Sequence, residues 1–394
     1  MIKIEFCKKC VESNNRFLSS VQHKDKPNTK KKYVAFDSQG VCLSCRYFEK
    51  KETFNWEEKE AKLKSILSKF RSKDGSYDVI VPGSGGKDSI YTSILLKEKY
   101  GMHPLTCTWA PGMYTDVGLK NYHSWLNYGF DNYLLTPNKK VHRLLTKLAF
   151  LNLLHPFQPF ALGQNSLPLK LALEKKIKLI IYGDSIKEKA VDQTEEDENI
   201  LKPKPWHFMD NNDEIFLGGE SVKKIQKNYK IDLSELNCFL PVRREIIENS
   251  EINLLHLPDF INYNPQDNFY FSKQKTGFEV NPDGRTEGTY TKYSSLDDKL
   301  DGLHYYTWFI KTGRGRATED AALEVRNKII TREEAVLLVK KFDGEFPKKY
   351  FKDCLNYMEI SENKFWETIE KFRPEHLWNK TGNEWSLKSA VWKK

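Results

Sequence analysis

Short apolar runs alternate with amphipathic segments along the central part of this chain. Five runs predict buried strands, at residues 77–82, 104–110, 132–135, 178–182 and 252–257. Apolar residues at helical spacing predict helices at 56–72, 88–100, 117–128, 139–154 and 166–176. Strands alternating with helices are typical of an α/β fold. We therefore expect a doubly wound parallel sheet with helices on both faces.

The two ends of the chain follow other patterns. Residues 1–52 are polar and Lys-rich, with no apolar period, whereas the chain after residue 260 is first aromatic and polar and then helical from about residue 317. Predicted helices there cover 318–327, 331–342 and 361–372, and Thr331 with Glu334 forms a capping box. We predict three domains: a four-cysteine unit at 1–52, a sheet domain at 53–260, and a mostly helical substrate or partner region at 261–394.

Residues 186–249 interrupt the alternation of strand and helix, and we interpret them as an insertion near the site. The acidic run 195–198 within it is typical of a solvated surface, with a Mg²⁺ or partner role as the alternative.

Composition limits the class of protein. At 394 residues and 39% hydrophobic content, the chain can bury a large core. It has no apolar run of about 18 residues and does not begin with a basic-then-apolar signal, so we expect a cytoplasmic protein without a membrane partner. The net charge of +9 suits a nucleic acid and a phosphate-rich small substrate equally, and so does not decide between them.

Four of the seven cysteines form two CxxC pairs, at Cys7, Cys10, Cys42 and Cys45. Four thiolates can complete a tetrahedral Zn²⁺ site, and a segment too short for its own core would gain its fold from the metal. The pairs predict a zinc ribbon with a structural role, because four cysteine ligands leave no open coordination position. The alternative is four reduced thiols in a loop.

A Gly-rich turn joins the first predicted strand to the next helix. Small residues let backbone N–H groups approach a phosphate, and the start of the helix adds partial positive charge. The turn lacks the Walker A pattern, because Val81 and Asp88 stand where that pattern needs Gly and Ser or Thr. It resembles instead the PP-loop of ATP pyrophosphatases, which split ATP into AMP and pyrophosphate to adenylate a substrate oxygen. Its residues are Gly83, Ser84, Gly85, Gly86, Lys87, Asp88 and Ser89.

Chemistry suggests a role for each side chain of this turn. Backbone N–H groups with the hydroxyls of Ser84 and Ser89 would hold the β- and γ-phosphates, while Lys87 would neutralise developing charge. Asp88 is either a Mg²⁺ ligand or a plain acid at the start of a helix. We predict Lys87, Asp88 and Ser89 as the catalytic residues.

Two further strand ends would lie at the same edge of the sheet. Thr108 and Trp109 are placed for an adenine pocket, although Trp109 could equally pack in the core. Gly183 and Asp184, followed by Ser185, suit contacts to ribose or substrate, and a turn with a helix cap explains them equally well.

The distal chain carries a second group of candidates. Lys311, Arg314 and Arg316 stand beside two glycines just before a predicted helix and could bind a carboxylate or phosphate of an acceptor. The alternative is a basic turn with solvated side chains. Glu287 and Tyr290, further upstream, are predicted to contact substrate as well.

These motifs together resemble the N-acetyl sugar amidotransferase family. The resemblance rests on the CxxC pairs, the Gly-rich turn and, above all, the blocks 287–290, 296–302, 304–306, 313–318 and 330–335. It implies an ATP- and Mg²⁺-dependent enzyme of bacterial surface-sugar biosynthesis, such as the pseudaminic acid, legionaminic acid, flagellin-glycan or lipopolysaccharide pathways. Such an enzyme adenylates the acetamido oxygen of an N-acetyl sugar, and ammonia then displaces AMP to give an acetamidino sugar.

The resemblance also bears on the source of ammonia. The chain shows no glutaminase domain and no cysteine at its start. Ammonia would thus come from solution or from a separate glutaminase. The resemblance implies such a partner, similar to the paired glutaminase and cyclase subunits of histidine biosynthesis.

Two other functions compete with this interpretation. A tRNA-thiolating PP-loop enzyme would need cysteines near the ATP site, but Cys107, Cys238 and Cys354 are isolated, so we do not expect a nucleic-acid partner. A non-catalytic zinc-ribbon module that binds nucleotide is disfavoured because Lys87 and Asp88 are both present.

Overall fold

The computed structural model describes residues 3–15, 22–27, 29, 34–184, 203 and 207–393. Ser185 and the acidic run 195–198 lie outside these residues. Among the helices described, none is long and apolar enough to cross a membrane.

A five-stranded parallel sheet forms the centre of the molecule. Its strands are β1 (Val79–Pro82), β2 (Pro104–Trp109), β3 (Asn132–Leu135), β4 (Leu179–Tyr182) and β9 (Asn253–His256), in the order β3-β2-β1-β4-β9. All five predicted strands are therefore present, and the predicted α/β fold with a doubly wound parallel sheet is confirmed. The order reverses between β1 and β4, and in such sheets ligands bind at the carboxyl ends of the strands beside this reversal.

Alternate residues of each strand enter cores on opposite faces of the sheet. Ile80 packs with α6 (Gln158–Lys175) on one face, whereas Val79 and Val81 pack with α2 (Trp56–Lys69) on the other. Three more helices follow the strands in turn, α3 (Lys87–Ile94), α4 (Asp116–Asn127) and α5 (Lys139–Leu153). α3 continues as one π-helical turn, Leu95–Lys99.

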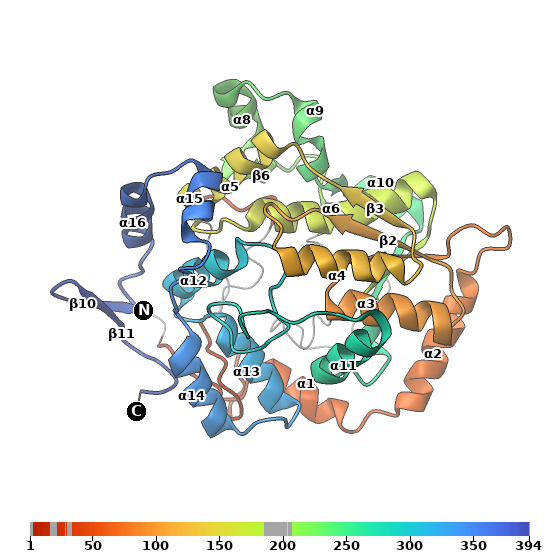
Figure 1. The fold of residues 1–394 in the computed structure, drawn as a ribbon, viewed down its shortest axis with the longest axis horizontal. Coiled ribbons are helices and arrows are strands. Elements are labelled where there is room, and N and C mark those ends of the chain that lie inside the picture. Colours follow the sequence, from red (N-terminus) through yellow and green to blue (C-terminus); the bar gives the residue numbers. More distant parts are fainter. Residues whose placement is uncertain are drawn as a thin grey trace.

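The insertion is part of the main core wherever it is described. It comprises short strands at 208–209, 216–217, 220–221 and 242–243, with helices α8 (Val222–Tyr229), α9 (Leu233–Leu236) and α10 (Arg244–Ser250). Ile225, Leu236 and Phe239 share the apolar cluster of α6 and the sheet. Figure 1 shows α8 and α9 on the opposite side of the molecule from α1 and α11.

Beyond the sheet, the chain is mostly helical. The helices are α11 (Pro265–Thr276), α12 (Asp301–Thr312), α13 (Arg316–Arg326), α14 (Arg332–Phe342), α15 (Phe351–Met358) and α16 (Glu362–Lys371), followed by a hairpin of β10 (Trp378–Thr381) and β11 (Glu384–Leu387). The capping box of Thr331 and Glu334 is confirmed.

The expectation that helices begin only near residue 317 is wrong, because α11 and α12 precede that point. α12 is buried on most sides, so its apolar residues show no clear helical period. α11 starts at Pro265, and the Asn264 side chain caps its first turn.

The N-terminal unit, which includes α1 (Leu43–Lys51), packs against the C-terminal helices. The four cysteines share an apolar cluster with Ala321 and Ala322 of α13 and with Ala335 and Val339 of α14. Figure 1 shows α1 beside α13 at the edge of the molecule. Segments from opposite ends of the sequence thus form one layer.

Candidate functional site

The Gly-rich turn joins the carboxyl end of β1 to α3, as predicted. Gly85 has φ of +84°, and a Cβ there would lie 2.7 Å from the Cα of Tyr122, so glycine is required at this position. Gly86 caps α3 without a side-chain hydrogen bond, which leaves the first N–H groups of the helix without a side-chain acceptor. The turn therefore has the geometry of an anion cradle.

Lys87 and Asp88 form an ion pair within this cradle. The ammonium of Lys87 lies 2.7 Å from both carboxylate oxygens of Asp88. Tyr263 donates a hydrogen bond of 2.7 Å to Asp88 Oδ1, and Asn268 donates one of 3.3 Å. Only 11% of the Lys87 side chain is exposed. Asp88 thus holds the lysine at the loop, and its role as a Mg²⁺ ligand stays a prediction.

The helix α11 supports the loop from the side. The Ser272 hydroxyl donates to the backbone carbonyl of Lys87 at 2.8 Å, and Asn268 of the same helix contacts Asp88. The Ser89 hydroxyl donates to the Gly86 carbonyl at 2.9 Å, which closes the turn internally.

The side chain of Trp109 packs in the core and does not form an adenine pocket. Only 2% of it is exposed, and it lies against Gly163 of α6 and edge-on to Phe239. The hydroxyl of Thr108 is also buried and accepts a hydrogen bond of 3.1 Å from the Asn132 side chain. Of the two alternatives for Trp109, the structure favours packing.

Gly183 brings the end of β4 against the start of α3. A Cβ at Gly183 would lie 2.6 Å from the backbone oxygen of Asp88, so only glycine permits this approach. The carbonyl oxygen of Asp184 lies 2.7 Å from Nδ1 of His256 at the end of β9. These residues therefore stand at the carboxyl edge of the sheet, as predicted, and their contacts to ribose or substrate stay a prediction.

Two cavities lie side by side next to the loop. A cavity of about 70 Å³ is lined by Ser84, Gly85 and Gly86 of the loop together with Tyr293 and Asp297. A larger cavity of about 340 Å³ is lined mainly by residues of the stretches 281–299 and 345–350, with the start of α4. Ser295 and Leu296 line both. We call residues 295–298 the dividing segment.

The consecutive carboxylates of the dividing segment reach different cavities. Asp298 pairs with Tyr114 in an isolated antiparallel bridge, and the Thr115 N–H donates to the Asp297 carbonyl at 3.2 Å. At such a bridge, the side chains of neighbouring residues point to opposite sides. Accordingly Asp297 lines the small cavity beside the loop, while Asp298 lines the large one.

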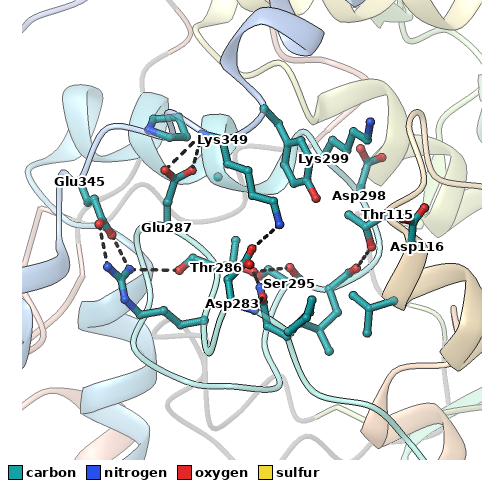
Figure 2. A pocket seen from close by; sticks show the side chains of 18 residues that line it. Thr115, Asp116, Asp283, Thr286, Glu287, Ser295, Asp298, Lys299, Glu345 and Lys349 are labelled. Atoms are coloured by element: carbon teal, nitrogen blue, oxygen red, sulfur yellow. Dashed lines mark hydrogen bonds and ion pairs between the residues drawn. The ribbon is translucent and has the colours of Figure 1, made fainter.

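The charges of the large cavity are mostly paired. Arg285 makes a bidentate ion pair with Glu345, at 2.6 and 2.8 Å, and Lys349 pairs with Asp283. The predicted substrate residue Glu287 lines this cavity and accepts backbone N–H groups of Lys348 and Lys349. Figure 2 shows Glu345 at one end of the cavity and Asp116 and Asp298 at the other.

The predicted second anion site does not form, because its three cations point to different partners. The ammonium of Lys311 donates to the Leu153 carbonyl at 2.8 Å. Arg314 is buried in an ion pair with Glu12 of the cysteine unit, at 2.6 Å, so its assignment to the acceptor is wrong.

Arg316 and Tyr290 also have protein partners. Arg316 donates to Asp320 at 2.8 Å, and its guanidinium also reaches the Tyr305 hydroxyl at 3.3 Å. Tyr290 donates to Glu324 at 2.6 Å and does not line either cavity.

The four cysteines converge as predicted. Their sulfur atoms all lie within 4.8 Å of one another, with 3.8 Å between Cys7 and Cys45 and 3.7 Å between Cys10 and Cys42. Backbone N–H groups of the knuckles point at the sulfurs, for example that of Cys42 at 3.3 Å from Cys7. Arg326 of α13 donates to Cys10 and Cys42, at 3.5 and 3.6 Å. Such a set suits a metal ion bound by four thiolates.

Sequence reasoning missed three aspartates at and just after the dividing segment, of which Asp298 and Asp301 are buried and Asp297 is half-buried. Burial raises the pKa of Asp298 to about 7, although backbone N–H groups of Leu300 and Gly112 oppose the rise. Burial likewise raises the pKa of Asp297, and it raises that of Asp301 well above the usual range, with the two neighbouring carboxylates adding to the effect. The signal was the Asp-rich block 296–302, which carried the family resemblance but received no role.

One comparison with known proteins supports the resemblance that the distal part of the chain carries. Residues 287–391 match the family model of LPS biosynthesis protein WbpG-like, C-terminal domain. The chain carries a WbpG-like domain. This match confirms the resemblance to the N-acetyl sugar amidotransferase family on the part of the chain that carried it. The WbpG-like domain supplies most of the large cavity and the dividing segment.

Other similarities are more limited. A stretch of 75 residues is 33% identical to the uncharacterized protein MJ1599 of Methanocaldococcus jannaschii, and it spans 19% of this chain and 27% of that protein. The U34-tRNA thiolase NcsA from Methanococcus maripaludis, solved with its [4Fe-4S] cluster, superposes with a TM-score of 0.31 and 14% identity, over 82% of this chain and 90% of that chain.

A predicted subunit of tRNA methyltransferase from Methanocaldococcus jannaschii superposes with a TM-score of 0.25 and 16% identity, over 50% of this chain and 73% of that chain. Superpositions at these values carry no argument about substrate.

Proposed function

We propose that this protein is an ATP-dependent amidotransferase that converts the acetamido group of an N-acetyl sugar into an acetamidino group. ATP is split into AMP and pyrophosphate, and ammonia supplies the new nitrogen. The name of the matching family, LPS biosynthesis, supports a role in bacterial surface-sugar synthesis.

One observation carries this proposal: the phosphate cradle and the cavity of the WbpG-like domain share a wall. Ser295 and Leu296 border both spaces, so an acceptor in the large cavity would lie next to a nucleotide held by the loop. Adenylation needs this arrangement, because the acceptor oxygen must reach the α-phosphorus while pyrophosphate leaves into the cradle. The cavity of about 340 Å³ has the size of a small-molecule site.

The loop residues would act mainly by charge and position. Lys87 would exchange its contact with Asp88 for the phosphates and stabilise the charge that develops on pyrophosphate. Asp88, released from the lysine, would hold Mg²⁺ on the same phosphates. Glu287 would accept hydroxyl groups of the sugar at the far wall of the large cavity.

We further propose that the four cysteines hold one structural Zn²⁺. A tetrahedral ion with Zn–S bonds of about 2.3 Å separates its sulfurs by about 3.8 Å. The sulfur separations of 3.8 and 3.7 Å match this value. A [4Fe–4S] cluster would hold its four cysteines further apart, because each thiolate binds a different iron.

Ammonia supply is a separate part of the proposal. We propose a glutaminase partner that delivers ammonia to the large cavity, on the family resemblance alone. Saturating ammonium salt should replace that partner in the assay.

The thiolation alternative has little support in the described residues. Cys107 is buried in β2 and Cys354 in α15, and burial raises the pKa of both thiols. Cys238 is half-buried, and none of the three lines either cavity. No thiolate is therefore placed to carry sulfur to a substrate at the loop.

The test is a reaction of the purified protein with Mg-ATP, an ammonium salt and a panel of di-N-acetylated sugars, free and nucleotide-linked. We expect pyrophosphate, AMP and a sugar whose mass has changed by the exchange of O for NH. Lys87→Ala should abolish all three products. Lys311→Ala is the matched control and should retain them, because that ammonium contacts the Leu153 carbonyl. Pyrophosphate that forms only with tRNA and a sulfur donor would refute the proposal in favour of thiolation.

A further inference from the structure

The dividing segment places a buried aspartate at the wall of the large cavity, directly after the residues that border both cavities. Asp298 lines the large cavity, whereas its neighbour Asp297 lines the small one. An acceptor amide bound at this wall would direct its oxygen toward the nucleotide and its N–H toward Asp298. Figure 2 shows Asp298 at the end of the cavity next to Thr115 and Asp116.

The carboxylate of Asp298 is held rigidly and keeps capacity for a further hydrogen bond. The Leu300 N–H donates to Oδ1 at 2.9 Å, and the Gly112 N–H donates to Oδ2 at 2.7 Å. The backbone N–H of Met113 also interacts with this carboxylate. An ionised carboxylate has four lone-pair sites, so after these three donors one remains for a ligand. Only 3% of the residue is exposed, which shields this lone pair from competing water.

We propose that Asp298 is a catalytic base that binds the acetamido N–H of the acceptor and takes its proton during adenylation. This inference rests on the proposed function. It identifies the group that makes the amide oxygen nucleophilic, a role that neither the loop nor the paired charges of the cavity can fill.

Protons and electron pairs are conserved through adenylation and amination. The amide oxygen bonds to the α-phosphorus, the bond to the bridging oxygen breaks with its electron pair on pyrophosphate, and the N–H proton passes to Asp298. The product is a neutral imidate O-adenylate. Ammonia then attacks the imidate carbon and the C–O bond breaks to release AMP. Asp298 returns its proton to the sugar nitrogen, and the third ammonia proton leaves with AMP or into solvent, which gives an acetamidinium group.

The buried surroundings of Asp298 suit it to act as a general base. A base works best when its pKa lies near the working pH, and burial raises that of Asp298 to about 7. The ionisable groups around it are Asp297 and Asp301 on the same stretch, Lys139 and His142 of α5, Tyr114, and Cys354 and Tyr357 of α15. His142 stays neutral because burial lowers its pKa to about 3, and burial lowers the pKa of Lys139.

The test uses the adenylation half-reaction, followed as exchange between labelled pyrophosphate and ATP with acceptor sugar and no ammonia. Asp298→Asn should slow this exchange about 100-fold or more, the usual share of a general base. In the wild type, kcat/KM should rise with pH through an ionisation near 7. That ionisation should be lost in Asp298→Asn.

Asp343→Asn is the matched control. Asp343 is half-buried and also accepts backbone N–H groups, of Gly315 at 2.9 Å and Thr318 at 3.2 Å, but it lies outside both cavities. Its loss should lower stability to a similar degree and leave the exchange rate within a few-fold of wild type.

The outcomes separate the two proposals. If the wild type makes no acetamidino product, the proposed function falls and the role of Asp298 with it. If the wild type makes the product and Asp298→Asn exchanges within ten-fold of it, only the inference is overturned. Should Asp298→Asn fail to fold, a wild-type profile with no ionisation between pH 6 and 8 would still overturn the inference.

Discussion

A buried ion pair fastens the cysteine unit to the WbpG-like domain. Arg314 donates from Nε to Glu12 Oε1 at 2.6 Å and from Nη2 to Oε2 at 3.1 Å, and the side chains are both only 1% exposed. Arg326 lies 3.7 Å from the same carboxylate, and the Arg314 guanidinium lies over the ring of Trp308 at 4.7 Å. We predict that Arg314→Met destabilises the fold severely.

The magnitude follows from burial. Removal of one partner from a buried pair leaves an uncompensated charge and costs about 3–5 kcal/mol. Arg326 still compensates part of the Glu12 charge, so we expect a loss at the lower end, about 3 kcal/mol. The double variant Glu12→Gln with Arg314→Met should be more stable than Arg314→Met alone, because it buries no unpaired carboxylate.

The assay is urea unfolding of the metal-loaded protein, monitored by tryptophan fluorescence. Arg244→Met is the control, because its ion pair with Asp210 is exposed (41% and 55%) and should contribute about 0–1 kcal/mol. The reasoning is refuted if Arg314→Met loses less than about 1 kcal/mol, or if the double variant is no more stable than the single one.

Three further predictions test the loop, the metal and the core. Gly85→Ala should lower the free energy of unfolding by about 1–3 kcal/mol and abolish ATP binding in calorimetry, because Gly85 has φ of +84°. Gly86→Ala should fold normally, because Gly86 has φ of −72°. Equal stability of the two variants would contradict this prediction. Arg326→Met should lower zinc affinity about 10–100-fold in a chelator competition. An unchanged affinity would show that the contacts of Arg326 with the thiolates do not stabilise the bound metal. Gly163→Ala should destabilise by about 1–3 kcal/mol in thermal unfolding, because its Cβ would lie 2.3 Å from the Trp109 ring, and a neutral result would show that the core can relax there.

The sheet could be predicted from the sequence because its central strands are buried. Runs such as 104–110 are mostly apolar and fully buried, and the turns between strand and helix carry recognisable residues. The cradle was predictable for a similar reason: Gly85 and Gly86 have a local function that depends on backbone geometry alone. The convergence of the four cysteines followed from their spacing, since metal ligands must meet.

The candidate substrate residues were harder to predict. The chemistry of Lys311, Arg314 and Arg316 suggested one anion site, but each found a partner on a different element. A charged side chain that becomes buried must be paired, and its partner can come from anywhere in the chain, as Glu12 does for Arg314. The residues that flank a charged side chain in the sequence therefore do not reveal its partner.

The sequence by itself determined the strands, the loop and the metal ligands, because each depends on short-range pattern or on a few residues of fixed chemistry. Only the tertiary structure decided which carboxylates line the small cavity beside the loop and which line the large cavity. Asp297 and Asp298 are adjacent and chemically identical, yet the bridge of Asp298 to Tyr114 turns them toward different cavities. Burial raises the pKa of both carboxyl groups above that of a surface aspartate, and burial is a property of the packed molecule, not of the residue.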